Sequence, residues 1–246
     1  MATGTTSLDP TPKNQVDTFI YLRRLSYGGR ADAPLPAWRP SEDGTVWLGS
    51  FNNLGKLTPT TLDLWAKVLR ALPDAKLLLK TKELRTMSNR RRILDAMSER
   101  GVLQDRIVLQ DGKTSSSWVD HMAQYERMDI ALDSVGGIGG GTTTCDALWM
   151  GVPVVTREGN RMASRMTTSM LEAIGNPEWI ARSDSEYIAK VVALARDIEQ
   201  RKALRSNLRK RMAESALCDA LGLARILENA YSDMFETWFQ GDDRLR

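Results

Sequence analysis

The sequence predicts an α/β protein with a doubly wound, parallel, Rossmann-like sheet, and two observations predict this class. Short apolar runs typical of buried strands alternate with longer segments whose apolar side chains recur at helical spacing. A glycine-rich stretch lies between one such run, at 130–132, and a helical segment. Strands that alternate with helices usually form parallel sheets, because each crossover connection runs through a helix.

The elements are expected in a regular order. Strands are predicted at 45–51, 76–80, 106–110, 130–132 and 152–155. Helices are predicted at 58–72, 88–100, 115–127, 142–150, 161–174, 183–198 and 221–239. Thr58 and Ser183 are suited to cap the helices that follow them, and Pro59 suits a first helical position.

Two parts of the chain are distinguished. Residues 1–43 are interpreted as a polar tail and a junction, because Ala-Pro-Leu-Pro-Ala-Trp-Arg-Pro at 33–40 has the proline content of an extended linker. Residues 44–246 are expected to form one Rossmann-like domain that ends in helices.

The composition is that of an ordinary globular protein. Apolar residues make up 42% of the chain and charged residues 26%, and a net charge of +3 with interspersed signs gives no indication of nucleic-acid binding. Dense basic clusters at 90–92 and 201–211 fall in helical segments and are interpreted as solvated helix faces. The chain has one histidine, and Cys145 and Cys218 match no metal or redox spacing, so no metal site is expected.

The amino terminus is polar and lacks the apolar core of a signal peptide, and no run of about 18 apolar residues could span a membrane. We therefore expect a cytoplasmic protein without a membrane partner.

The functional interpretation depends on the stretch 129–156. Five glycines between 136 and 141 remove side chains directly after a strand, so that the backbone can turn tightly and a ligand can approach. Three threonines then place hydroxyl groups in the first turn of a helix. Because the first N–H groups of a helix lack intrahelical partners, this arrangement predicts an anion site. A strand-to-helix turn without a ligand is the alternative.

Two better-known glycine motifs do not fit. A P-loop ends in Gly-Lys followed by Ser or Thr, whereas no lysine occurs between Lys113 and Lys190. The dinucleotide fingerprint requires a third glycine where Thr142 stands. Glu158, after the next strand, could imitate the acid that binds the ribose, so an NAD-dependent oxidoreductase remains a minor alternative.

Three polar segments are expected at one edge of the sheet, since ligands of doubly wound sheets bind at the carboxyl ends of the strands. Asn53 and Lys56 follow the first strand, the segment after the third strand leads to His121, and the glycine loop follows the fourth strand.

Four stretches carry a family resemblance. They are Phe-Asn-Asn-Leu-Gly-Lys-Leu-Thr-Pro at 51–59, residues 120–133, Thr-Thr-Thr-Cys-Asp-Ala-Leu-Trp-Met-Gly-Val-Pro-Val-Val-Thr at 142–156, and a weaker match at 159–165. Together they resemble the carboxyl-terminal half of the O-linked N-acetylglucosamine transferase (SPINDLY-type) family of glycosyltransferases. The resemblance implies one lobe of the GT-B architecture with two Rossmann domains. It also implies a UDP-sugar donor such as UDP-N-acetylglucosamine, inverting transfer to Ser or Thr hydroxyls of a protein or peptide, and no cofactor or metal.

The resemblance also implies roles for single residues. Lys56 is expected to act catalytically at the diphosphate, where a lysine and helix N-terminal donors stabilise the charge that develops on UDP. Thr142 and Thr143 would hold phosphate oxygens, Asp146 the ribose hydroxyls, and His121 would lie beside the uridine. The complete expected set of substrate-binding residues is Asn53, His121, Gly141, Thr142, Thr143, Thr144 and Asp146.

Each role has a plainer alternative. Lys56 could be a surface lysine, His121 a core histidine on the helical face of Trp118 and Tyr125, and Asp146 an acid that complements the helix dipole.

The sequence departs from the family in two places and in length. Residues 134–138 replace a stretch that often contains aromatic residues and proline, and Gly141 stands where some members have a histidine. The amino-terminal catalytic lobe and the tetratricopeptide repeats have no counterpart. The chain is therefore expected to be incomplete for catalysis alone and to need a separate amino-terminal lobe or repeat-containing chain. A non-catalytic UDP-sugar-binding or scaffold module is the main alternative.

The last predicted helix has one apolar side, formed by Leu227, Ala230, Tyr231, Met234, Phe235 and Trp238. We expect this side to pack on the missing lobe and, without that lobe, to favour self-association.

Overall fold

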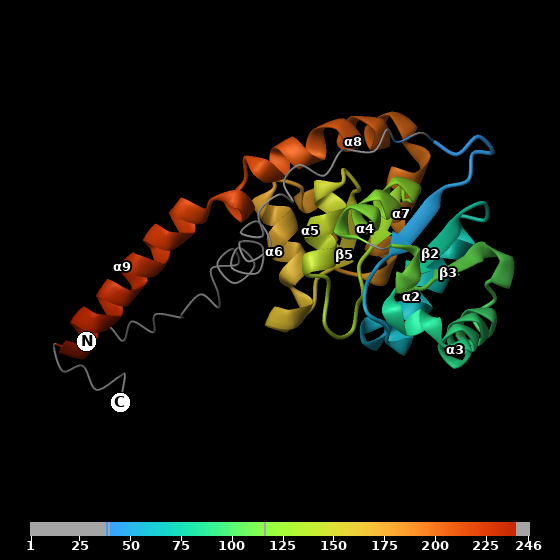
Figure 1. Cartoon of the computed structure of the whole chain (residues 1–246), viewed down its shortest axis with the longest axis horizontal. Coiled ribbons are helices and arrows are strands. Elements are labelled where there is room, and N and C mark those ends of the chain that lie inside the picture. The colour runs from blue at the N-terminus through green and yellow to red at the C-terminus, as the bar shows by residue number, and fades with distance from the viewer. Residues whose placement is uncertain (1–37, 39, 116, 240–246) are drawn as a thin grey trace.

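The computed structural model describes residue 38 and residues 40–115 and 117–239, and it shows a six-stranded sheet whose strands are all parallel (Figure 1). The strands are β1 (Trp47–Ser50), β2 (Lys76–Lys80), β3 (Ile107–Gln110), β4 (Ile130–Leu132), β5 (Val154–Arg157) and β6 (Ile180–Ala181). Their spatial order is β3-β2-β1-β4-β5-β6, so the order reverses between β1 and β4. The predicted fold class is confirmed, and this reversal is where such sheets bind ligands.

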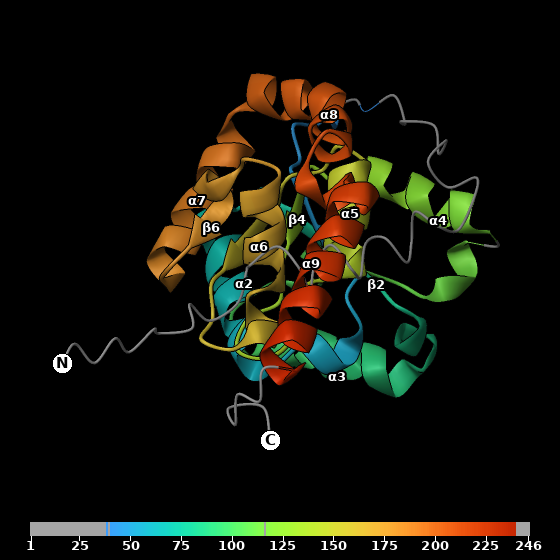
Figure 2. The same cartoon turned by 90° about the vertical axis from the view of Figure 1, so that its left-hand side faces the viewer.

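The helices are α2 (Pro59–Ala71), α3 (Met87–Ser98), α4 (Trp118–Ala123), α5 (Thr142–Trp149), α6 (Met166–Ala173), α7 (Asp184–Arg196), α8 (Ile198–Ala213) and α9 (Ala220–Phe239). On one face of the sheet, α2 packs against α3 and α7. Helices α5 and α6 lie on the other face, where both contact β5 (Figure 2). The core is apolar and continuous through both layers, with Leu48 at the centre of the sheet paired to Leu77 and Ile130.

The two predicted helix caps are confirmed. The Thr58 hydroxyl accepts a hydrogen bond from the Thr61 N–H at 3.2 Å, and Pro59 is the first residue of α2. The Ser183 hydroxyl accepts one from the Glu186 N–H at 3.1 Å.

Three predicted boundaries were wrong. The helix expected at 183–198 ends at Arg196, because the Asp197 carboxylate accepts a hydrogen bond from the Gln200 N–H at 2.8 Å and so begins α8 as a separate helix. The helix expected at 161–174 is a 3-10 turn followed by the shorter α6, and the helix expected at 115–127 is α4 followed by a 3-10 turn. The two-residue strand β6 was not predicted.

The interpretation of residues 201–211 as a solvated face was also wrong. Arg201 and Arg205 on α8 are buried, with 6% and 7% of their surface exposed. The Arg205 guanidinium donates to the carbonyl oxygens of Tyr125 and Met150 at 3.2 and 2.9 Å, and Arg201 lies 3.6 Å from Asp129. These bonds compensate the burial of charge and fix α8 across the amino edge of the sheet.

Helix α9 differs from all of these, because it extends away from the sheet and its two layers (Figure 1). Leu223 is its one buried residue. None of the helices in the described ranges is long and apolar enough to cross a membrane. The expected tail and junction lie largely outside the described residues, and the boundary near residue 43 stays a prediction.

Candidate functional site

A cavity of about 540 Å³ opens at the carboxyl edge of the sheet, beside the reversal between β1 and β4. Asn53, Lys56, His121, Thr142 and Thr143 all line it. The structure therefore brings together five of the predicted site residues, from the loop after β1, from α4 and from the first turn of α5. Gly141, Thr144 and Asp146 are not among the residues that line it.

Lys56 ends a 3-10 turn (Leu54–Lys56) and is directed at the glycine loop. Its Nζ donates to the carbonyl oxygens of Gly139 and Gly140 at 2.8 and 2.5 Å, and lies 3.4 Å from Asn52 Oδ1. Partial burial lowers the pKa of Lys56, and the negative charge of Asp133 acts in the opposite direction. The side chain is thus a cation held at the loop and not a surface lysine.

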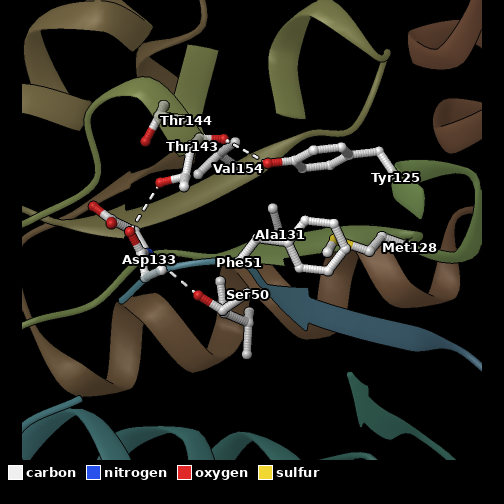
Figure 3. A pocket seen from close by; sticks show the side chains of 11 residues that line it. Ser50, Phe51, Tyr125, Met128, Ala131, Asp133, Thr143, Thr144 and Val154 are labelled. Atoms are coloured by element: carbon white, nitrogen blue, oxygen red, sulfur yellow. Dashed lines mark hydrogen bonds between the residues drawn. The ribbon is translucent and has the colours of Figure 1, made fainter. Parts of the chain in front are cut away.

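The amino end of α5 is tied to β1 by a chain of hydrogen bonds, drawn in Figure 3. Thr143 Oγ1 donates to Asn52 Oδ1 at 2.8 Å, Asn52 Nδ2 donates to Ser50 Oγ at 3.2 Å, and the Tyr125 hydroxyl reaches the Thr143 carbonyl at 3.4 Å. These bonds surround a small cavity of about 10 Å³, close to the space that one water molecule needs. They hold the first turn of α5 in a fixed position.

Sequence reasoning selected Asn53 and missed Asn52. The Asn53 carboxamide accepts from the Gly55 N–H at 2.7 Å and is exposed, so it caps the 3-10 turn. Asn52 is buried and contacts both Lys56 and Thr143. The signal that could have found it is the strand period of two, which places Ser50 and Asn52 on the same side of the chain.

Asp133 forms the floor of the glycine loop. It is 2% exposed, accepts from the Thr156 hydroxyl at 2.7 Å and from the Ser134 N–H at 2.9 Å, and also receives a side-chain bond from Thr167. Burial raises the pKa of its carboxyl, while these hydrogen bonds and the charge of Lys56 act in the opposite direction. The Asp133 side chain therefore holds the glycine loop in place through these buried hydrogen bonds.

Thr144 belongs to this floor as well. Its hydroxyl lies 3.0 Å from that of Thr167 and accepts from the Gly141 N–H at 3.3 Å. A Cβ at Gly140 would lie 1.8 Å from Thr144 Oγ1, so the loop requires glycine there. Gly141 has φ of +126°, a conformation that side chains strongly disfavour. The structure thus places Thr144 and Gly141 where they shape the loop.

His121 and Asp146 lie next to each other on facing helices. His121 Nε2 is 4.0 Å from Asp146 Oδ2, and Asp146 is 4% exposed. On the other side of the ring, Lys80 Nζ is 3.2 Å from His121 Nδ1 and is also bonded to Ser115 Oγ.

Sequence reasoning missed Lys80, the last residue of β2. It lies 5.4 Å from the centre of the Phe51 ring and lines the same cavity. Desolvation by burial lowers the pKa of Lys80 to about 8, and Asp120 acts in the opposite direction. Its position at a carboxyl strand end could have identified it.

These contacts define what the site can do. Lys56, the amino end of α5, Thr142 and Thr143 line one cavity, an arrangement that suits phosphate groups. Among the described residues, no group of three or more His, Cys, Asp or Glu side chains could hold a metal ion. Charge stabilisation by cations and N–H groups, rather than acid–base work by paired carboxylates, is the chemistry that the arrangement supports.

A parallel sheet of this order with a glycine-rich loop at its reversal defines a Rossmann-like lobe. Comparison with known proteins specifies the family. Residues 37–225 match the model of glycosyl transferase family 41, and the chain belongs to this family.

Named relatives agree with this assignment. The chain is 37% identical over 209 residues to the "Probable UDP-N-acetylglucosamine--peptide N-acetylglucosaminyltransferase SPINDLY" of Solanum lycopersicum, covering 85% of this chain and 22% of that protein. It is 37% identical over 238 residues to the protein of the same name in Arabidopsis thaliana, covering 94% and 25%. The chain therefore spans a quarter or less of the length of these relatives.

Solved structures show the same architecture. The O-GlcNAc transferase of Thermobaculum terrenum, solved as a mutant, superposes with a TM-score of 0.71 at 39% identity, covering 81% of this chain and 38% of that one. Anabaena HepE, in complex with UDP and glucose, has a TM-score of 0.53 at 14% identity, covering 77% and 49%, which is a likeness of fold alone. The lobe is of the GT-B type found in glycosyltransferases.

Proposed function

We propose that this chain is the donor-binding lobe of a protein O-glycosyltransferase that uses a UDP-sugar, with UDP-N-acetylglucosamine as the expected donor. The observation that carries the proposal is that Lys56, Thr142 and Thr143 line one cavity at the amino end of α5. The diphosphate is the ligand group that this set of donors fits. The names of the relatives support the choice of donor and of a peptide acceptor.

The proposed chemistry assigns Lys56 to the leaving group. When the acceptor hydroxyl attacks the anomeric carbon, the bond from that carbon to the β-phosphate oxygen breaks and its electron pair remains on UDP. Lys56 Nζ is held by the carbonyl oxygens of Gly139 and Gly140, and a phosphate would replace these weaker acceptors by charged ones. A cation and helix N–H groups then stabilise the developing charge, so the proposal requires no metal.

The acceptor and the general base are proposed to come from outside this lobe. The proton of the attacking hydroxyl needs a base close to the anomeric carbon, and transfer requires donor and acceptor in one cleft. The exposed apolar side of α9 supports an amino-terminal lobe or a separate repeat-containing chain as the partner. The cytoplasmic location expected from the sequence is part of this proposal.

A non-catalytic UDP-sugar-binding module is the second candidate function. The buried floor of the loop, formed by Asp133, Thr156 and Thr167, would serve binding without transfer equally well. The two functions can be separated by adding in trans a complete family member that lacks its own donor site. A transferase lobe should then release UDP from UDP-N-acetylglucosamine, and a non-catalytic module should not.

The first test is a thermal-shift and calorimetric titration of the purified chain with UDP and with NAD. Saturation at about 100 times the dissociation constant adds roughly 2.7 kcal/mol to the free energy of unfolding, which corresponds to several degrees. We expect Lys56→Met to weaken UDP binding about 10–150-fold, the equivalent of a charge-assisted bond of about 1.5–3 kcal/mol. Asp146→Asn is expected to weaken it about tenfold.

Matched controls separate the site from general effects of charge. Lys210→Met removes an exposed lysine on α8, and Asp63→Asn removes an exposed carboxylate on α2. Neither should change UDP affinity. Binding of NAD in preference to UDP, or equal loss in Lys56→Met and Lys210→Met, would sink the proposal.

A further inference from the structure

His121 is the only histidine of the chain, and its ring is contacted on both nitrogens. Nδ1 lies 3.2 Å from Lys80 Nζ, and Nε2 lies 4.0 Å from Asp146 Oδ2. The ring also packs on Phe51 and Tyr125, with centroid distances of 5.7 and 5.9 Å. Three elements, β2, α4 and α5, thus meet at one imidazole.

The contact with Lys80 decides where the proton of the neutral ring lies. A charged ammonium group has three hydrogens and no acceptor, so the nitrogen that faces it must accept. An ammonium group at this position therefore favours the neutral tautomer that has no hydrogen on Nδ1 and its N–H on Nε2. Asp146 on the other side is an acceptor when ionised, so both neighbours favour the same tautomer.

The position of the Lys80 side chain is itself fixed by its contacts. Its Nζ is bonded to Ser115 Oγ on the loop after β3, its side chain lies over the Phe51 ring, and only 4% of the residue is exposed. A lysine so buried at the end of a strand has few rotamers to choose from. Its ammonium group is therefore fixed relative to the imidazole.

Nε2–H and the Asp146 carboxylate together form a donor and an acceptor 4.0 Å apart. A hydroxyl group both donates and accepts, and an oxygen about 2.8 Å from each atom would satisfy both distances. A ring with its hydrogen on Nδ1 would instead offer two acceptors on this side. The tautomer thus determines whether a hydroxyl group of a ligand can bind there with both of its bonds.

We propose that Lys80 is a positioning residue that holds His121 in its Nε2–H tautomer, so that His121 and Asp146 jointly bind one ribose hydroxyl of the nucleotide. The claim that His121 and Asp146 bind a ribose hydroxyl rests on the proposed function. The claim that Lys80 sets the tautomer of His121 does not. Lys80 touches no reacting atom in this scheme and acts through the imidazole.

The tautomer is measured first, without any ligand. In the chain labelled with 15N-histidine, a single residue gives the signals, and at pH 7.5 we expect Nε2 to be protonated and Nδ1 unprotonated. In Lys80→Met the two nitrogen signals should move toward each other as the tautomers exchange. Lys80→Arg should restore much of the difference, because a guanidinium group also only donates.

Lys76→Met is the matched control. Lys76 begins the same strand, and its Nζ lies over the Trp47 ring at 5.7 Å, away from His121. The 15N spectrum of Lys76→Met should equal that of the wild-type chain. A wild-type ring with its hydrogen on Nδ1, or a Lys80→Met spectrum identical to that of wild type, would overturn the assignment. The wild-type spectrum alone decides the first point if a variant does not fold.

The ribose part is tested by comparing UDP with 2′,3′-dideoxy-UDP. We expect Lys80→Met to weaken UDP about tenfold and to leave the dideoxy analogue nearly unchanged. Equal losses for both nucleotides would mean that Lys80 acts on the phosphates by its charge, which contradicts the proposal. If neither nucleotide binds the wild-type chain, the proposed function and the ribose part fail together, and the tautomer is still decided by the spectrum.

Discussion

The carboxyl edge of the sheet and helix α9 are organised in opposite ways. At the edge, buried polar groups satisfy one another: Asp133 accepts from Thr156 and from the Ser134 N–H, and Thr143 donates to Asn52. On α9, Phe235 and Trp238 are each 62% exposed. The candidate site is thus held together by its own hydrogen bonds, whereas α9 has an apolar surface that the described residues do not cover.

This difference shows which properties belong to the lobe itself. A satisfied polar network needs no further protein to be rigid, so nucleotide binding should be a property of this chain. An apolar helix in water gains stability only when something covers it. The comparison can be tested by changing each region in turn.

The largest effect is expected at Asp133. Asp133→Ala leaves the Thr156 hydroxyl and the Ser134 N–H without their buried acceptor, which should lower the free energy of unfolding by roughly 2–6 kcal/mol at about 1–3 kcal/mol per group. Urea denaturation followed by circular dichroism measures this. Asp63→Ala, which removes an exposed partner of Arg100, should cost about 1 kcal/mol or less. Equal denaturation midpoints for the two variants would contradict the view that the edge is a tightly coupled network.

A smaller effect is expected within the glycine loop. A Cβ at Gly140 would lie 1.8 Å from Thr144 Oγ1 and 2.4 Å from Thr167 Oγ1, so Gly140→Ala forces these hydroxyls apart. We expect a loss of about 1–3 kcal/mol in unfolding free energy, together with weaker UDP binding. Gly137→Ala is the matched control, because its nearest contact is the Thr58 methyl group at 3.4 Å, and it should stay within about 0.5 kcal/mol of wild type. An unaltered Gly140→Ala protein would show that the loop is more adaptable than its contacts indicate.

The smallest effect on stability is expected at α9. Replacing Phe235 and Trp238 together by serine should change the unfolding free energy by about 0.5 kcal/mol or less, because both side chains are exposed. The same change should abolish self-association, which sedimentation velocity over a range of concentrations can follow. Serine at the exposed positions Glu228 and Glu236 of the same helix is the control. A wild-type chain that stays monomeric at every concentration would count against an unpartnered interface on α9.

The sequence was sufficient for the features that depend on local chemistry. Buried apolar runs located β1 to β5, and the side chains of Thr58 and Ser183 located two helix starts. The reversal of strand order placed the loops after β1 and β4 together, as expected for a doubly wound sheet. The roles proposed for Lys56, His121 and Asp146 in catalysis and binding stay predictions.

The features that sequence reasoning missed depend on contacts between distant segments. Strand β6 has two residues and exists because Ile180 pairs with Thr156. In the sequence, Arg201 and Arg205 cannot be told from solvated charges, because the carbonyl oxygens that they contact belong to other elements. Lys80 becomes part of the site only because α4 brings His121 against it. No local pattern contains this information.

The reversal of the strand order also determines when the site can form during synthesis. On one side, β1 pairs with β2, which follows it closely in the sequence. On the other side, it pairs with β4. Next to that pairing, the Trp47 N–H donates to the Asp129 carboxylate, 82 residues further along the chain. Until the ribosome has released β4, the growing chain exposes one unpaired edge of β1 to other strands. Pairings this distant also form slowly. The pairing of β1 with β4 should therefore form only after β1, β2 and β3 have been made, and chaperone binding to the half-made lobe is expected at the open edge of β1.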